Sequence, residues 1–243
     1  SGPGSGAPPA GWQDRRVDFA LPPELETLAA EARELGEGWA ERSDICEESW
    51  IVGHDVEVAR ALAERGWIGM TWPTEHGGGG RSVLERFVVF EALIAAGAPI
   101  AASWFADRQI GPTLLEFGTP EQQERFLPGM LSGEDMWGIG MSEPDAGSDV
   151  ASIRTRAIRD GDHYVVDGQK VWTSGAAHAD FVYLVARTDP DAPPHKGLSE
   201  LIVDLRSPGV TVEPILDMTG SRHFCEVFLD AVRVPAANLV GTP

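Results

Sequence analysis

Residues 137–149 read WGIGMSEPDAGSD, and residues 167–176 read DGQKVWTSGA. The first stretch starts as a strand and continues into a loop of small and hydroxyl-bearing residues, which lets a planar or phosphorylated ligand approach the backbone. A lone loop of this composition is more often a simple turn than a ligand site, because short motifs are weakly specific. The same stretch marks where the spacing of apolar residues changes, and this change decides the fold class.

Before Trp137 the apolar residues are spaced as in helices. Leu25, Leu28 and Ala32 follow the pattern of a single helix face. The sequences Ser82–Glu85 and Thr119–Gln122 match capping boxes, which predict helix starts near residues 83 and 120. Helices are predicted over residues 24–47, 55–65, 83–97, 103–117 and 120–131.

From Trp137 onward the chain consists of short runs rich in β-branched residues. Turn sequences such as Asp160-Gly161 and Asp167-Gly168 separate these runs. Antiparallel strands are predicted over residues 153–159, 163–171, 181–187, 198–205, 210–215 and 224–234.

The two patterns predict an α+β fold with two domains. An all-α helical domain is expected at residues 15–135, followed at 136–243 by an antiparallel β-domain of barrel or sandwich type, with the break near 132–136. Residues 1–14, which begin SGPGSG, are expected to be a tag remnant and a disordered lead.

Composition excludes several classes of protein. The 243 residues carry a net charge of −19, with 42% hydrophobic and 23% charged residues, which is ordinary for a globular chain. The acidic charge argues against nucleic acid or an anionic membrane face as a general partner, since binding phosphates requires a cationic surface. The two cysteines, Cys46 and Cys225, form no zinc or disulfide pattern, and no membrane span or signal pattern is present, so a cytoplasmic location is expected.

The two opening stretches occur together, and the pair is much more specific than either alone. SEPDAGSD at 142–149 followed by DGQKVWTSGA at 167–176 resembles the flavin-binding pair of the acyl-CoA dehydrogenase family. Three further stretches resemble family sequences in the same order: PTEHGGGG at 73–80, FGTPEQQERFLPGMLSGE at 117–134 and EVFLDAVRVPAANLVG at 226–241. The resemblance runs from about residue 15 to 241 and implies the family's N-terminal helical and middle β-domains, without its C-terminal four-helix domain.

The resemblance implies FAD as cofactor and assigns residues to it. Ser142 matches a hydroxyl that bonds the flavin ring, Trp172 matches a tryptophan packed on that ring, and Ser148 matches a serine that touches the flavin phosphate or the CoA part of the substrate. Asp145 stands where the family more often has glycine. The residues implied to bind the cofactor are Ile139, Met141, Ser142, Gly147, Ser148, Trp172, Thr173 and Ser174.

A substrate-binding role is implied for a helix near residue 105. By position, Phe105 and Arg108 correspond to a helix that borders the acyl pocket in relatives, and Ser148 is the third residue implied to contact substrate. An arginine there could meet a polar acyl group, although a charged helical residue more often faces solvent.

Several other polar residues invite a chemical interpretation, and a structural one is favoured for each. Glu143 and Asp149 could be a paired-carboxylate site, but carboxylates on a turn more often bond backbone N–H groups. His76 beside four glycines is expected in a tight turn. The set His178, Asp180, His223 and Cys225 matches no ligand or nucleophile pattern, so no metal site is expected.

The implied activity is flavin-dependent α,β-dehydrogenation of an acyl-CoA thioester, in which the α-proton is removed and the β-hydride goes to FAD. The family's glutamate base lies in the C-terminal domain, beyond Pro243 in this numbering, so no catalytic residue is assigned here. Two alternatives stay open: a flavin oxidase or monooxygenase of the same fold, and a non-catalytic subunit of a two-chain assembly. The implied partners are the thioester, an electron-transfer flavoprotein or similar acceptor, and further subunits in a homotetramer or hetero-oligomer.

Overall fold

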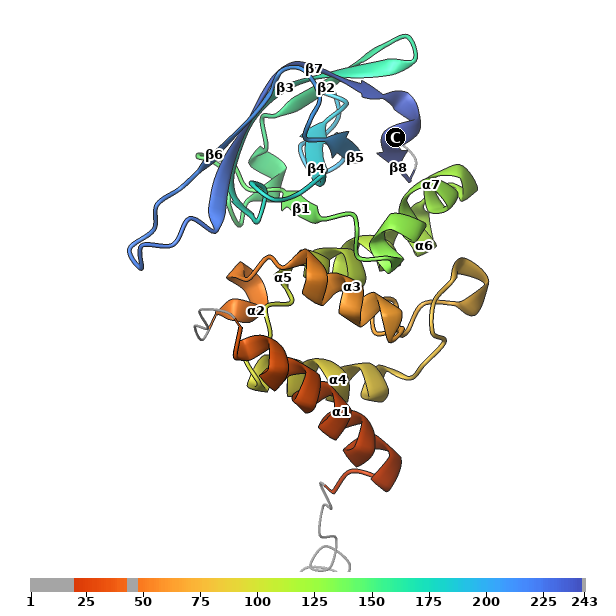
Figure 1. Ribbon diagram of the computed structural model, residues 1–243. Coiled ribbons are helices and arrows are strands. Elements are labelled where there is room, and N and C mark those ends of the chain that lie inside the picture. The colour runs from red at the N-terminus through yellow and green to blue at the C-terminus, as the bar shows by residue number, and fades with distance from the viewer. Residues whose placement is uncertain (1–19, 43–47, 242–243) are drawn as a thin grey trace, which may run out of the picture.

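The structure is a computed structural model that describes residues 20–42 and 48–241. Helices make up one half of the molecule and strands the other, as Figure 1 shows. The α-helices are α1 (Pro23–Ala40), α2 (Ser49–Val52), α3 (Val56–Glu64), α4 (Val83–Ala95), α5 (Ala101–Phe105), α6 (Gly111–Phe117) and α7 (Pro120–Leu131). A π-helical segment, Ala106–Ile110, joins α5 to α6.

The predicted helices are largely confirmed. Both capping boxes are present, with Ser82 and Thr119 each accepting from the backbone N–H three residues on, and they start α4 and α7 where expected. The first helix is shorter than predicted, because α1 ends at Ala40 after two glycines that lower helix propensity. Its predicted residues 43–47, like the predicted lead 1–14, lie outside the described part of the chain.

Eight strands form one mainly antiparallel sheet. They are β1 (Trp137–Gly140), β2 (Arg156–Asp160), β3 (His163–Ser174), β4 (Phe181–Arg187), β5 (Leu198–Asp204), β6 (Val210–Pro214), β7 (Phe224–Pro235) and β8 (Leu239–Val240). The order across the sheet is β6-β7-β3-β2-β4-β5-β8, and β1 pairs with β4. The fold is therefore α+β, as predicted.

The antiparallel prediction is wrong for two pairs, since β1 runs parallel to β4 and β2 meets β4 in a parallel bridge at Arg156 and Arg187. The chain leaves β1 through a long loop and re-enters the sheet at Arg156, not at Ile153 as predicted. Ile153 instead packs into a small cluster with Ala146 and Val185. This long excursion places the loop after β1 against the rest of the sheet.

Apolar packing joins the two halves. One cluster brings Phe126 and Ile110 of the helical half against Trp137, Tyr183 and Ile202 of the sheet. The Trp137 ring lies edge-on to Phe126, with centroids 5.5 Å apart, and 4.9 Å from Phe181. The start of β1 is thus fixed from both sides. Within the described residues, no helix has the length and apolar character to cross a membrane.

Candidate functional site

The two sequence motifs meet in the fold. The N–H of Val171 in β3 donates to the carbonyl of Ser142, at 2.9 Å, just after β1. Close by, Nζ of Lys170 donates to the carbonyl of Met141 at 3.0 Å. Residues 27 to 29 positions apart in sequence are therefore bonded directly, and the loop after β1 is tied to the end of β3 where the predicted flavin residues lie.

A buried ion pair holds this junction. Lys170 is fully buried, and its Nζ lies 2.8 Å from Oε1 of Glu143. The same carboxylate accepts the backbone N–H groups of Arg154, at 2.7 Å, and Thr155, at 2.9 Å. Desolvation alone would raise the pKa of Glu143, but these hydrogen bonds lower it overall, while burial lowers the pKa of Lys170. Glu143 thus fastens both ends of the loop.

These contacts confirm that Glu143 bonds backbone N–H groups. Sequence reasoning missed its ionic partner, because nothing in the sequence pairs Lys170 with a residue 27 positions away. A lysine in an otherwise alternating strand, at a position that faces the core, was the available signal. Asp149 does not join this network; its carboxylate accepts from the Ser152 hydroxyl within a local turn.

Trp172 has an unusual backbone. Its φ is +60°, in the left-handed region that non-glycine residues rarely adopt, and the pairing of β3 with β7 shifts register between Lys170 and Thr173. The side chain is 55% exposed and meets the Phe224 ring edge-on, with centroids 5.7 Å apart. A bulge therefore turns a large aromatic side chain outward, at a backbone cost that clusters at functional sites.

The residues after Trp172 differ in accessibility. Thr173 is fully buried and its Oγ1 has no hydrogen-bond partner among the described residues, so its side chain faces the sheet interior. Ser174 is half-buried at the end of β3. Only the backbone of Thr173 lies where a ligand on the outer side could reach it, whereas the hydroxyl of Ser174 stays accessible.

The loop after β1 presents the other predicted residues. Gly147 and Ser148 are both exposed, and a Cβ added at Gly147 would meet open space. Ser142 is half-buried beside its bond to Val171. Asp145, the residue at the family's usual glycine, points outward to an exposed ion pair with Arg154 at 3.2 Å, so it does not fill the loop.

A cavity of about 490 Å³ lies beside Met141, which is 41% exposed. Its other walls include the apolar side chains of Phe117, Val150 and Leu198, and the carboxylate of Glu200. Ile139, by contrast, is turned toward the core between the two halves, where it packs with the Trp137 cluster. Met141 is therefore the member of β1's neighbourhood that faces open space.

The predicted substrate residues lie on a separate helix. Phe105 is half-buried at the end of α5, and Arg108 is exposed in the π-helical segment, with its guanidinium 5.4 Å from the Trp104 ring centroid. Helix α5 reaches the sheet through Ala102, which packs with Met136 immediately before β1. The two residues are thus near the same junction but belong to its helical side.

An internal ion pair supports that helix. Asp107 is buried and is bonded by Arg86, whose Nε lies 3.0 Å from Oδ2, and by the N–H of Gly69 at 2.8 Å. Burial raises the pKa of Asp107 although Arg86 opposes the shift. The π-helical turn therefore keeps Asp107 inside and places the next residue, Arg108, outside.

The remaining sequence interpretations are structural, as expected. His76 ends a short 3-10 turn before Gly77, whose φ is +83°. Cys225 is buried in the sheet core and His178 is exposed. Within the described residues, no group of His, Cys, Asp and Glu side chains is arranged to hold a metal ion.

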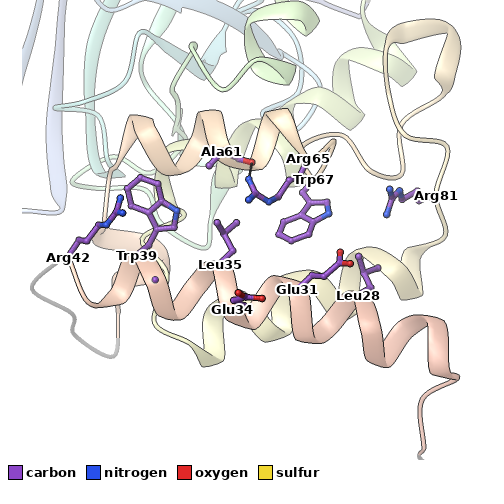
Figure 2. Close-up of a pocket in the computed structure, with 11 residues that line it drawn as sticks. Leu28, Glu31, Glu34, Leu35, Trp39, Arg42, Ala61, Arg65, Trp67 and Arg81 are labelled. Atoms are coloured by element: carbon purple, nitrogen blue, oxygen red, sulfur yellow. Dashed lines mark hydrogen bonds between the residues drawn. The ribbon is translucent and has the colours of Figure 1, made fainter.

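A larger groove of about 760 Å³ lies away from this site, between α1 and α3 (Figure 2). The rings of Trp39 and Trp67 lie on either side of Leu35 in it, and Arg42 and Arg65 each lie near one of the rings. None of the predicted flavin residues lines this groove. The site is assigned to the junction of the two motifs and not to the groove.

The chain belongs to the acyl-CoA dehydrogenase family. Residues 22–134 match the model for "Acyl-CoA dehydrogenase, N-terminal domain", and residues 138–232 match "Acyl-CoA dehydrogenase, middle domain". The acyl-CoA dehydrogenase IpdE1 of Mycobacterium tuberculosis is 46% identical over 182 residues, covering 75% of this chain and 47% of the relative. The mitochondrial isovaleryl-CoA dehydrogenase of Pongo abelii is 32% identical, covering 96% of this chain and 59% of the relative.

Solved structures give the same result. The structure titled "Tcur3481-Tcur3483 steroid ACAD" superposes with a TM-score of 0.85 at 41% identity, covering 93% of this chain and 59% of that one. The ChsE4-ChsE5 complex from Mycobacterium tuberculosis superposes with a TM-score of 0.82 at 37% identity, covering 93% of this chain and 58% of that one. The chain spans about half the length of the curated relatives it matches.

Proposed function

We propose that this chain provides the helical and flavin-binding parts of an FAD-dependent acyl-CoA dehydrogenase. The observation that carries the proposal is the junction of the two motifs: the Val171–Ser142 hydrogen bond and the Lys170–Glu143 ion pair hold the segments around Met141 and Trp172 together. Family membership supports the same function. The division at about residue 135 is part of the proposal, with a helical domain before it and a flavin-binding domain after it.

The residues at the junction fit a flavin. A planar ring needs an aromatic surface and nearby donors, and Trp172 offers an outward indole from a strained bulge while Ser142 and Ser174 offer half-buried hydroxyls. A cofactor phosphate needs donors without bulk, and the exposed backbone of Gly147 and Ser148 provides them. In a chain of net charge −19, these local donors must outweigh the overall field.

When bound, FAD supplies the hydride acceptor for α,β-dehydrogenation of a thioester. This chain's residues bind and orient it: Trp172 packs on the ring, Ser142 and Ser174 donate to its polar edge, and the Glu143–Lys170 pair fixes the loop that carries Ser148. The base that removes the α-proton is assigned to a part of the protein outside residues 1–243. The cavity beside Met141 and the exposed Ser148 are suited to the thioester arm of the substrate.

A two-chain assembly is the arrangement we propose for the complete enzyme. Two neighbours of high structural similarity carry paired names, one titled as a complex and the other as a steroid ACAD. They favour a hetero-oligomer over a homotetramer, and a bulky, ring-bearing acyl group as the substrate. An electron-transfer flavoprotein or similar acceptor and a cytoplasmic location complete the proposal.

A visible absorbance spectrum of the complete protein, purified with any subunit that accompanies it, tests the proposal. We expect a flavin spectrum, and FAD in the supernatant after the protein is denatured. Release of FMN would correct the cofactor. A colourless protein that takes up no added FAD would overturn the proposal and favour the non-catalytic subunit.

Replacing Trp172 separates ring packing from backbone strain. We expect Trp172→Ala to weaken FAD binding about 10-fold, the effect of losing one stacked aromatic contact. Trp172→Gly should weaken it similarly while leaving the apoprotein at least as stable, because glycine adopts a φ of +60° without strain. Phe87→Ala, at an exposed aromatic on α4, is the control. Unchanged FAD affinity in both Trp172 variants would remove this residue from the site.

A further inference from the structure

Three histidine rings lie together where the connection between α2 and α3 meets the sheet. His54 stacks on His178, with ring centroids 4.8 Å apart and planes at 22°. The His54 ring is also 6.1 Å from that of His223, with planes at 30°. These residues come from three segments: the connection after α2, the loop after β3 and the loop before β7. His54 is therefore the member that links the helical half to both loops.

The His54 ring lies directly against the backbone that follows the flavin-binding segment. Gly175 comes immediately after Ser174, has a φ of +68°, and a Cβ built on it would lie only 2.3 Å from Nε2 of His54. Glycine is needed there both for the backbone conformation and for the close approach of the ring. The N–H of Gly175 also donates to the carbonyl of His223, at 2.9 Å.

Aromatic contacts continue from these histidines to Trp172. The His223 ring is 4.6 Å from that of Phe224, and Phe224 meets Trp172 edge-on at 5.7 Å. His54 thus touches the flavin-binding segment from two directions. One route runs through Gly175 to Ser174, and the other runs through His223 and Phe224 to Trp172.

The surroundings favour neutral rings. Nδ1 of His54 lies 3.0 Å from the carbonyl of Val52, and both ring nitrogens of His223 are buried without a partner among the described residues. Burial lowers the pKa of His54 to about 4, helped by the proximity of His178 and His223, and burial also lowers the pKa of His223. The carboxylates of Glu48 and Asp217 face His223 and oppose its shift.

We propose that His54 is a positioning residue for the flavin-binding segment, its ring wedged against Gly175 so that Ser174 and Trp172 keep their orientation. The inference rests on the proposed function, since it concerns the same cofactor. His54 itself does not touch the flavin. Its role is to transmit the position of the helical half to the strand end that carries the cofactor contacts.

The test is the affinity of the deflavinated protein for FAD. His54→Ala should weaken FAD binding about 10-fold. His54→Asn, which keeps a donor for Val52 but cannot reach Gly175, should weaken it equally, whereas His54→Phe, which keeps the ring, should stay within about 3-fold of wild type. His195→Ala, at an exposed histidine in the loop after β4, is the matched control.

A double-mutant cycle tests the contact with Gly175. Gly175→Ala should weaken FAD binding in the wild type, because its Cβ collides with the His54 ring. It should weaken FAD binding less in the His54→Ala background, where the ring is gone. Additive losses would show that the two residues do not act through each other and would overturn the inference.

The pH profile gives a readout that packing alone would not move. The pKa of His54 is about 4 in the folded state and 6.5 in the unfolded chain, so the unfolded state binds more protons as the pH falls through this window, and stability is lost. Between pH 7 and 5 we expect the unfolding equilibrium constant to rise about 5-fold more for wild type than for His54→Phe. Equal rises would mean that His54 does not titrate as a neutral wedge.

The outcomes separate the two proposals. A wild type that binds no FAD overturns the proposed function and this inference with it. A wild type that binds FAD, with His54→Ala or His54→Asn indistinguishable from His195→Ala, overturns the inference alone. Loss in His54→Phe equal to that in His54→Ala, with both apoproteins as stable as wild type, also overturns it.

Discussion

Lys170→Met is expected to lower the free energy of unfolding by about 3–5 kcal/mol, the usual cost of removing one partner from a buried ion pair. The loss arises because Glu143, only 8% exposed, would keep its charge with just two backbone donors. The loop that carries Ser148 would lose its anchor to β3, so FAD affinity should fall as well. Urea denaturation of the apoprotein and FAD titration of the folded protein measure the two effects.

Removing both charges should recover part of the stability. We expect Glu143→Gln with Lys170→Met to be more stable than Lys170→Met alone by about 1–3 kcal/mol, because no uncompensated buried charge is left. Lys196→Met, at an exposed lysine, is the matched control and should change stability by less than about 0.5 kcal/mol. A Lys170→Met protein as stable as Lys196→Met would show that the pair does not hold the junction.

Arg86→Met should be nearly as damaging, by about 3–5 kcal/mol at pH 7. The Asp107 side chain is 1% exposed and would lose its cationic partner, keeping the N–H of Gly69. Because burial already raises the pKa of Asp107, loss of Arg86 raises it further. The deficit should therefore be smaller at pH 5 than at pH 7, since a protonated Asp107 no longer carries a buried charge.

Two variants check this explanation. Asp107→Asn should cost less than Arg86→Met, because the asparagine still accepts from Gly69 and the freed Arg86 retains 19% exposure of its side chain to water. Arg154→Met removes the exposed pair with Asp145 and should cost less than about 1 kcal/mol. If the Arg86→Met deficit grew on acidification, the assignment of the loss to an unpaired Asp107 would be wrong.

The sequence predicted those parts of the fold that depend on local chemistry. The capping boxes at Ser82 and Thr119 located α4 and α7, and the change of periodicity at Trp137 located the start of the sheet. The strand 181–187 was predicted with its observed ends because turn residues bound a buried, β-branched run. Where the ends were wrong, at Ala40 and Ile153, the outcome depended on tertiary packing.

The site was predicted less completely, because its geometry depends on long-range contacts. The resemblance named Trp172, but the left-handed φ and the bulge that turn it outward arise from pairing with β7. Thr173 was grouped with Ser174, although strand alternation places its side chain in the interior. The parallel pairing of β1 with β4 was likewise not visible locally, since parallel partners are distant in sequence.

The most direct test of the central claim is anaerobic mixing of the complete protein with a panel of acyl-CoA thioesters while the visible flavin absorbance is followed. The panel should include short, branched and ring-bearing acyl groups. We expect the flavin to bleach with at least one thioester, with a ring-bearing acyl group most effective, and the matching α,β-unsaturated thioester to appear. A protein that carries FAD but is bleached by none of them, and forms no unsaturated product, would contradict the assignment as an acyl-CoA dehydrogenase.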